Sequence, residues 1–438
     1  MSISSSMNAG VAGLAAQSMS ISTISDNIAN SSTTGYKRAT TDFAAMVIGG
    51  NQWSSYTAGG VRATALRNVA AQGALTTTSN STDLAITGRG MLPVTSITDV
   101  RAGSTDLPFL MTTTGSFKPD ANGYLTTATG HVLLGVPVAD DGVTPAFPRT
   151  TSASLVPVRI QANQIQGSPT TEMSISANLP ADETLPEADG ATKTMSATYY
   201  DNLGGAQTLA FTFTPTVPAT GTARSNAWTM TVTDSAQGDA VVGTYAMTFT
   251  DTSVNNGRIA TVARVGTVGG AYDAATGALT VTTASGPIEI NVGQPGEAGR
   301  FTQFADDFSP GNTTKDGAAA SSMTGVEVDA SGYVVATYGD GDTRRLFQIP
   351  VVDVPNPNGL TALSSQTYAP SEASGAFILW DAGSGPTGEI QGYAREESSV
   401  DVAEELTQLI RTQRAYSSNA KIIQTVDEML QETTNLKR

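Results

Sequence analysis

Residues 398–438 read SSVDVAEELTQLIRTQRAYSSNAKIIQTVDEMLQETTNLKR, and this stretch decides how the chain is organised. It has no Gly or Pro and is rich in Ala, Leu, Glu, Gln, Lys and Arg, the residues that favour helices. Ser398 is expected to cap the helix, with Asp401 in the place of the capping-box acid. Acidic residues lie near its start, and Lys437 and Arg438 end it, which suits the helix dipole.

One face of this helix carries a heptad seam, a row of residues at alternating spacings of three and four. Gln413 and Asp427 fill the polar places of the row. At 1.5 Å per residue the helix would be roughly 60 Å long, so no surface within the chain is an obvious partner for it. The other members are Val402, Leu406, Leu409, Tyr416, Ala420, Ile423 and Leu430.

Residues 4–30 form a second candidate helix, because they contain no Pro, Lys or Arg and show the same spacing. Gly10 and Gly13 each cost about 1 kcal/mol of helix stability, so this helix is expected to be weak without a partner. Pattern alone favours two amphipathic helices that close one globular domain. The alternative is a terminal coiled coil that also packs against other copies. The apolar members of its seam are Ile3, Met7, Leu14, Ile21, Ile24 and Ile28, and Gly10 and Gln17 fill the remaining places of the row.

Chain length, net charge and composition limit the class of protein. The 438 residues suffice for two to four domains, and a net charge of −16 argues against nucleic acid or anionic membrane as a partner. Cysteine is absent, which excludes disulfides and thiolate metal sites. No apolar run approaches the ~20 residues that span a bilayer. The absence of Lys and Arg before Lys37 is unlike an ordinary secretory signal.

The middle of the chain predicts β structure. Two similar turns, DANG at 120–123 and DASG at 329–332, each lie between short extended runs, and a long insertion separates them. We therefore expect them to belong to one β domain built from two segments. Within the insertion, period-two alternation at 193–200, 208–213, 227–232 and 246–250 predicts an antiparallel sheet with one wet face. NLGG at 202–205 supplies a turn.

The predicted fold is multi-domain and mainly β, with α-helical termini that form a coiled coil, a split β domain and an inserted outer β domain. The order along the chain is nested, so each domain except the inserted one is made of two segments. The expected boundaries are 1–32 with 398–438 for the terminal helices, 33–72 with 364–397 for an irregular extended linker, 73–160 with 318–363 for the split β domain, and 161–317 for the insertion.

Candidate catalytic residues are few. A Ser–His–Asp arrangement could only use His131, whose apolar, strand-like surroundings favour a structural, half-buried side chain. Asp306 and Asp307 are adjacent and would point to opposite sides of a strand, so a solvated turn is favoured over a catalytic pair. The turn acids at 120–123 and 339–342 lack the full ligand set of a calcium loop. We predict no catalytic, cofactor or metal site.

The terminal stretches resemble the bacterial flagellar rod and hook proteins. The matching residues of this signature are Asn27, Asn30, Gly35, Tyr36, Lys37, Gln413, Arg414 and Asn419. The motifs are ISDNI (24–28), ANSSTTGYK (29–37), QGAL (72–75), DLAITGRG (83–90), GVEVD (325–329), NPNGL (356–360), SVDVAEEL (399–406), QRAY (413–416) and NAK (419–421). YDNLG at 200–204 is similar to the version in hook proteins. Two places depart from the family pattern: MLP at 91–93 replaces an aromatic pair, and REE at 395–397 replaces Leu-Glu.

The resemblance implies a flagellar hook subunit that polymerises into a curved tube and acts as a universal joint between rod and filament. It implies terminal helices lining an inner tube, with the split β domain outside them and the insertion outermost. The implied partners are other copies, a rod protein at the proximal end, a hook–filament junction protein at the distal end, the hook cap and the flagellar type III export apparatus. The implied location is extracellular.

Two other readings stay open at this point. A distal rod protein shares both terminal signatures but lacks a large outermost domain, so the insertion favours the hook. A secreted β-rich adhesin or glycan-degrading tail-type protein would explain the central β structure, yet it leaves the paired seam-bearing termini unexplained.

Overall fold

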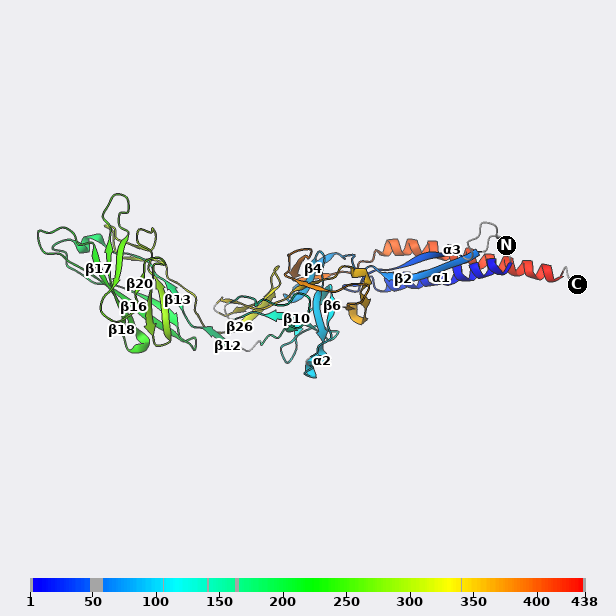
Figure 1. Ribbon diagram of the computed structural model, residues 1–438, viewed down its shortest axis with the longest axis horizontal. Helices are drawn as coiled ribbons and strands as arrows, with labels where there is room; N and C mark the ends of the chain where they lie inside the picture. Colours follow the sequence, from blue (N-terminus) through cyan, green and yellow to red (C-terminus); the bar gives the residue numbers. More distant parts are fainter. Residues whose placement is uncertain are drawn as a thin grey trace. The chain divides into compact units, whose positions relative to one another are not determined.

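The computed structural model describes residues 3–47, 58–104, 106–139, 142–161, 165–339 and 341–435. The chain is mainly β with a long helix at each end, which confirms the predicted fold class (Figure 1). It divides into two compact units. Unit 1 comprises residues 1–162, 325–337 and 343–438, and unit 2 comprises residues 163–324 and 338–342. No helix among the described residues is long and apolar enough to cross a membrane.

The two terminal helices are α1 (Ile3–Ala29) and α3 (Val402–Asn435). Asp401 caps α3, because its Oδ1 accepts hydrogen bonds from the backbone N–H groups of Ala403 (2.8 Å) and Glu404 (3.2 Å). The predicted cap at Ser398 is therefore wrong. Just before the helix begins, Ser399 N donates instead to the Tyr36 carbonyl at 3.0 Å. Lys437 and Arg438 lie outside the described residues.

A β-hairpin packs along α1. Its strands are β1 (Ala39–Val47) and β2 (Ala58–Arg67), antiparallel with Ala39 opposite Arg67. Gly60 brings the hairpin close to the helix: its φ is +81°, and a Cβ there would lie 3.0 Å from the Cβ of Ala12. The sequence predicted only an irregular linker here, so the hairpin is a finding of the structure.

The β body of unit 1 is built from two separated segments, as expected. Its main sheet runs β27-β28-β10-β5-β6-β31-β30. The strands are β27 (Tyr333–Tyr338), β28 (Thr343–Gln348), β10 (His131–Pro137), β5 (Leu92–Ser96), β6 (Leu110–Thr112), β31 (Tyr368–Ala369) and β30 (Thr361–Ala362). Strands β9 (Leu125–Thr126) and β11 (Val156–Pro157) pair with β10, and β8 (Lys118–Pro119) pairs with β9. Helix α2 (Ile97–Arg101) follows β5.

Three smaller sheets complete unit 1. Two of them join early strands to late ones, so the segments before and after unit 2 share one body, and the third pairs two late strands. They are β33 (Glu389–Gly392), β4 (Asp83–Thr87) and β7 (Thr114–Ser116); β3 (Leu75–Thr77) with β34 (Ala394–Glu396); and β29 (Val351–Asp353) with β32 (Ile378–Trp380).

The DANG turn is confirmed, since Asp120 Oδ1 accepts from the N–H groups of Asn122 and Tyr124 at 2.9 Å between β8 and β9. The DASG turn is confirmed too: Asp329 Oδ1 accepts from Tyr333 N at 2.8 Å.

Unit 2 contains the antiparallel sheet that the alternation predicted. The first five-stranded sheet is β15 (Lys193–Tyr200), β16 (Ala206–Pro215), β17 (Ala227–Asp234), β18 (Ala240–Phe249) and β19 (Ile259–Arg264). The second is β20 (Tyr272–Asp273), β21 (Ala278–Thr283), β22 (Gly286–Asn291), β13 (Glu172–Ser174) and β25 (Thr314–Lys315). A small sheet contains β23 (Phe301–Thr302), β14 (Ala177–Asn178) and β24 (Ser309–Pro310). Strand β12 (Ile165–Ser168) pairs with β26 (Ala318–Val328), whose residues 325–328 belong to unit 1.

The two faces of the first sheet of unit 2 differ sharply. The inward positions, Trp228, Tyr199, Phe211 and Phe213 among them, are fully buried in one apolar core. The outward positions form a row of threonines in register, Thr194, Thr212, Thr231 and Thr244, each directly opposite the next. No outward position carries a charge: the residues are Thr194, Ser196, Thr198, Tyr200, Ala206, Thr208, Ala210, Thr212, Thr214, Ala227, Thr229, Thr231, Thr233, Val241, Thr244, Ala246, Thr248, Thr261 and Ala263. We call this surface the threonine face.

Candidate assembly site

Helices α1 and α3 lie side by side and run in opposite directions (Figure 1). Two close approaches set their alignment. A Cβ placed on Gly10 would lie 3.1 Å from Cγ1 of Ile423, and one on Gly13 would lie 2.9 Å from Nδ2 of Asn419. Position numbers therefore rise along α1 as they fall along α3. The glycines that weaken α1 as an isolated helix are the residues that let α3 approach it.

The contact between the helices is made largely by small and polar residues. On α3, Glu405, Thr412 and Val426 are buried, and Leu409, Asn419 and Ile423 are half-buried. On α1 the buried residues are Ser5, Gly10, Gly13, Ala16, Ser20, Ile24 and Asn27. Each small or polar residue there contributes less apolar burial than a Leu or Ile at the same position would.

The predicted seam is only partly covered within one chain. Ile24 is buried, and Leu14, Ile21, Ile28, Leu409, Ala420 and Ile423 are half-buried. Leu406 is 47% exposed. Met7, Val402, Tyr416 and Leu430 are likewise exposed, and the side chain of Ile3 lies outside those described. Ile423 of the seam thus lies in the α1–α3 contact, whereas Val402, Leu406 and Tyr416 are exposed.

Further apolar side chains on both helices are exposed and were not in the predicted seam. Ile410 is 52% exposed and follows Val402 and Leu406 at spacings of four, which places the three along one stripe of α3. The others are Val11, Met19, Ile422 and Met429. The signal in the sequence was present: α3 carries apolar residues on more sides than a single partner helix can cover. Exposed apolar stripes of this kind mark interaction surfaces.

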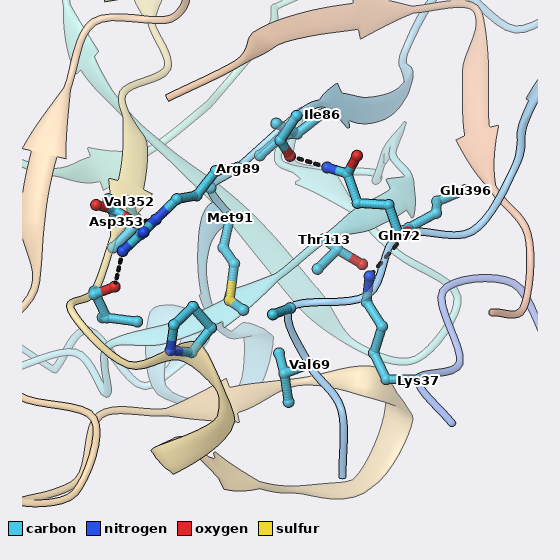
Figure 2. Close-up of a pocket in the computed structure, with 15 residues that line it drawn as sticks. Lys37, Val69, Gln72, Ile86, Arg89, Met91, Thr113, Val352, Asp353 and Glu396 are labelled. Carbon is cyan, nitrogen blue, oxygen red and sulfur yellow. Dashed lines mark hydrogen bonds and ion pairs between the residues drawn. The ribbon is translucent and has the colours of Figure 1, made fainter. Parts of the chain in front are cut away.

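A buried ion pair joins the start of the chain to the segment before α3. Lys37 Nζ lies 2.7 Å from Glu396 Oε1, and the two side chains are 1% and 4% exposed. Lys37 also donates to the Ala71 carbonyl at 2.7 Å, and Gly73 N donates to the same Glu396 oxygen at 2.7 Å. Figure 2 shows the pair at the wall of a cavity of about 460 Å³.

Tyr36 and Asn27 fasten the end of α1 to the chain that follows. The Tyr36 hydroxyl donates to Asp26 Oδ2 (3.0 Å) and Asn27 Oδ1 (3.1 Å). Asn27 in turn exchanges two hydrogen bonds with the backbone of Ala39. The Arg67 guanidinium lies 5.1 Å from the Tyr36 ring centre. Burial, followed by the Asp26 hydrogen bond, raises the pKa of Tyr36 to about 12.

Arg38 fastens the start of α3 to the same place. Its Nε lies 2.5 Å from Glu405 Oε1, its Nη2 lies 3.1 Å from Glu404 Oε1, and its backbone N–H donates to the Ser399 hydroxyl at 2.9 Å. Burial alone would lower the pKa of Arg38, but the hydrogen bond and charge of Glu405 outweigh it and raise the pKa. We call residues 26–39 together with 396–405 the junction.

The signature residues have distinct places. Asn30 Nδ2 donates to the Asp26 carbonyl and carboxylate at the end of α1. Gly35 has φ +71° and donates to the Glu396 carbonyl at 2.8 Å, and a Cβ there would lie 2.8 Å from Thr114 Cγ2. Gln413 and Arg414 are exposed on α3. The junction therefore gathers the N-terminal signature, whereas the C-terminal one divides between α3's exposed side and its contact with α1.

The two departures from the family pattern also lie near this site. Met91 is buried and lines the cavity of Figure 2. Arg395 pairs with the buried carboxylate of Asp83 at 3.2 Å, while Glu396 forms the ion pair with Lys37. Hydrogen bonds to Asp83 from Ser116 and Asn80, together with Arg395, outweigh burial and lower the pKa of Asp83.

The residues considered as catalytic candidates do not form a common site in the structure. His131 is half-buried on β10, its Nδ1 is 3.1 Å from Thr129 Oγ1, and burial lowers its pKa. Asp306 and Asp307 are exposed in a turn. Within the described ranges, no group of three or more acidic or His side chains is placed to hold a metal ion.

Comparison with known proteins gives matches along the whole chain. Residues 7–37 match the family described as flagella basal body rod protein, residues 390–436 the C-terminal family of flagellar basal body rod FlgEFG proteins, and residues 169–318 the D2 domain family of flagellar basal body protein FlaE.

Individual relatives match from end to end. The flagellar hook protein FlgE of Brucella suis is 34% identical over 444 residues, covering 100% of both chains. That of Rhizobium meliloti is also 34% identical with full coverage of both, and that of Salmonella typhimurium is 27% identical over 99% of this chain and 100% of that one. The crystal structure of Helicobacter pylori flagellar hook protein FlgE2 gives a TM-score of 0.48 at 11% identity, over 72% of this chain and 99% of that chain.

Proposed function

This chain belongs to the flagellar hook protein family, and we propose that it polymerises through its terminal helices into the curved, flexible tube of a flagellar hook. The tube acts as a universal joint that transmits torque from rod to filament. The chain is a structural subunit with no catalytic part in this process. The exposed apolar stripes of α1 and α3 carry the proposal, because a single chain leaves Leu406 and Ile410 facing water.

In the polymer, neighbouring copies bury the apolar side chains that a single chain leaves exposed. The α1–α3 contact includes many small and polar residues, so apolar burial contributes less to it than in an all-apolar seam. When copies pack around a common axis, the stripe at Val402, Leu406 and Ile410 enters neighbouring helices and the seam on α1 does the same. Burial of each such side chain contributes about 1.5–3 kcal/mol, which makes the helices stable in the polymer.

The junction holds the helices to the β body while the tube turns. The Lys37–Glu396 pair and the Arg38–Glu405 pair link residues that are far apart in the chain but adjacent in space. The ion pairs involve both chain segments that connect the helices to the β body, the one after α1 and the one before α3. They therefore resist rotation of the helix pair against the β body. We assign to the junction the role of passing torque between the inner and outer parts of a subunit.

The further assignments follow from the family. We infer four domains, with 1–32 and 398–438 lining the tube, 33–72 and 364–397 linking, 73–160 and 318–363 forming the split β domain, and 161–317 lying outermost. The inferred partners are a rod protein, a hook–filament junction protein, the hook cap and the export apparatus. The inferred location is outside the cell, reached through the flagellar channel.

The distal rod protein is the second candidate, since rod families match both termini. The match of residues 169–318 to the D2 family and the full-length likeness to hook proteins favour the hook. The test is expression of the full chain in a relative from which the hook gene is deleted. Electron microscopy is expected to show curved hooks and swimming is expected to return; straight shafts, or no tubes, would overturn the proposal.

A further inference from the structure

The cavity of about 460 Å³ in Figure 2 lies within unit 1, between the segment after β2 and the loops that follow β4 and β29. Its volume falls in the range of small-molecule sites, about 300–1,000 Å³. Much of its wall is apolar and belongs to the buried interior of the fold. The apolar side chains there are 1–5% exposed: Val69, Ile86, Met91, Val352 and Val354.

One buried hydroxyl on this wall has no partner. Thr113 lies between β6 and β7, lines the cavity and is 7% exposed. Both of its neighbours are bonded, since Thr112 Oγ1 donates to the Thr114 carbonyl at 2.9 Å and Thr114 Oγ1 donates to the Leu84 carbonyl at 2.8 Å. The Thr113 hydroxyl forms no hydrogen bond within the described part of the chain. It is therefore available to a molecule in the cavity, and leaving it without a partner is unfavourable.

The buried ion pair supplies a second polar group. Glu396 uses Oε1 for both Lys37 Nζ and Gly73 N, and its Oε2 has no hydrogen bond or ion pair among the described residues. Figure 2 shows Thr113 between Met91 and this pair. A ligand hydroxyl can donate to the Glu396 carboxylate and accept from Thr113, so one hydroxyl satisfies both groups.

The charges and the soft groups on the wall narrow the class of ligand. Lys37 pairs with Glu396, and Arg89 Nε lies 2.6 Å from Asp353 Oδ1, so no charge on the wall lacks a partner. A charged ligand would lose its hydration without gaining a free counter-charge, and the site favours an uncharged one. The Met91 thioether and the Arg89 guanidinium both make favourable contacts with aromatic rings.

We propose that this cavity binds a small uncharged aromatic molecule with a hydroxyl group, a phenol. The ring packs against Val69 and Met91, and the hydroxyl bonds to Thr113 and Glu396. This binding goes beyond the proposed function and does not require assembly.

The mouth of the cavity favours a free molecule over a side chain carried by another protein. Among the lining residues Ala70, Gln72 and Arg89 are exposed, which places the mouth beside them. Gln72 Nε2 donates to the Gly88 carbonyl, and Arg89 Nη2 donates to the Val354 carbonyl at 2.6 Å. These bonds tie together the loops around the mouth, and a small free ligand passes such a mouth more readily than a side chain attached to a backbone.

Binding is measured by NMR of the purified full chain with its 12 methionine methyl groups labelled, and Met91→Leu identifies the signal of Met91. The probes are phenol and benzene, which differ only by the hydroxyl. We expect phenol to shift the Met91 signal saturably, with a dissociation constant on the order of 1 mM, as suits so small a ligand. Benzene should bind about fivefold more weakly, because it leaves the hydroxyl-binding groups without a partner.

Three variants test the assignment. Thr113→Val keeps the branched shape and removes the hydroxyl, so phenol should lose most of its advantage over benzene. Ala70→Trp places a large side chain at the exposed mouth and should weaken both probes. Thr64→Val, at an exposed position of β2 outside the cavity, is the matched control and should change neither. Circular dichroism checks that each variant is folded.

Four results overturn the proposal. They are a Met91 signal that phenol does not shift, equal affinities for phenol and benzene in the unsubstituted chain, an undiminished preference for phenol in Thr113→Val, and undiminished binding in Ala70→Trp. The last decides the matter if Thr113→Val fails to fold. A Met91 signal that ignores phenol but shifts with protein concentration would assign the cavity to a neighbouring copy instead. Hook formation is scored separately, so its failure leaves this result intact.

Discussion

Lys37 Nζ lies 2.7 Å from Glu396 Oε1, and this buried contact joins residues 359 positions apart in the chain. Removing one partner leaves the other charge buried without compensation, which costs about 3–5 kcal/mol. We therefore expect Lys37→Ala and Glu396→Ala each to lower the free energy of unfolding of unit 1 strongly. Urea titration followed by circular dichroism measures the change.

Two further variants make that prediction specific. Lys37→Met with Glu396→Leu removes both charges and should be far milder than either single change. The exposed pair Arg149–Asp381, at 2.7 Å with side chains 42% and 39% exposed, supplies the control, and Arg149→Ala should cost about 1 kcal/mol or less. Equal losses for the buried and the exposed pair would contradict the importance of the junction.

The apolar stripe of α3 predicts a defect in assembly without a defect in folding. Leu406 is exposed in the single chain, so Leu406→Asp should leave the unfolding transition of the monomer nearly unchanged. In the tube the carboxylate would be buried unpaired, at a cost of several kcal/mol, so hooks should not form. Swimming in soft agar and electron microscopy are the measurements, and Ser418→Asp, also exposed on α3, is the control. A swimming Leu406→Asp strain would show that the stripe has no partner.

Asp83 predicts a loss of stability in acid. Its pKa is lowered in the folded chain from the ordinary value of 3.8, so the folded state binds its proton less readily than the unfolded state. The stabilisation is complete above pH 3.8 and is lost as pH falls through the folded pKa. Asp83→Asn should therefore flatten the acid limb of the stability curve of unit 1, whereas the exposed Asp307→Asn should leave it unchanged. If the acid limb of the stability curve is unaltered in Asp83→Asn, Asp83 is not the cause of the loss of stability in acid.

Unit 2 has its own apolar core, so the chain without it should still fold and assemble. When residues 163–324 are replaced by a short Gly-Ser linker, tubes are expected to form because the inner helices are untouched. Their curvature or stiffness is expected to change because the outer domain is gone. Electron microscopy of the tubes provides the measurement. Tubes of native curvature and stiffness, or no tubes, would contradict this division of labour.

Local patterns were enough to predict the helices, the two Asp-containing turns and the first sheet of unit 2, because each depends on spacing within a few residues. They marked only part of the face by which α1 meets α3. Gly10 and Ile423 belong to the predicted rows and approach each other, whereas Gly13 and Asn419 lie outside those rows.

Features that depend on distant contacts were beyond the sequence alone. The hairpin of β1 and β2 is stabilised by packing on α1, and its Gly-rich connection looks irregular in isolation. The Ser398 cap failed for a similar reason: Ser399 N pairs with the Tyr36 carbonyl, and no local rule anticipates that bond. Glu396 was noted only as a departure from the family pattern, yet it is one half of the buried ion pair.

The threonine face has a consequence for the habitats in which such a protein can work. Attraction and repulsion between charged surfaces change with dissolved salt, since the screening length shrinks from about 30 Å at 0.01 M to about 3 Å at 1 M. Thr212, Thr231 and Thr244 interact through hydroxyl and methyl groups, which that screening does not reach. A contact made through this face is therefore expected to depend less on salt than a contact between charged surfaces, although the chain as a whole carries a net charge of −16.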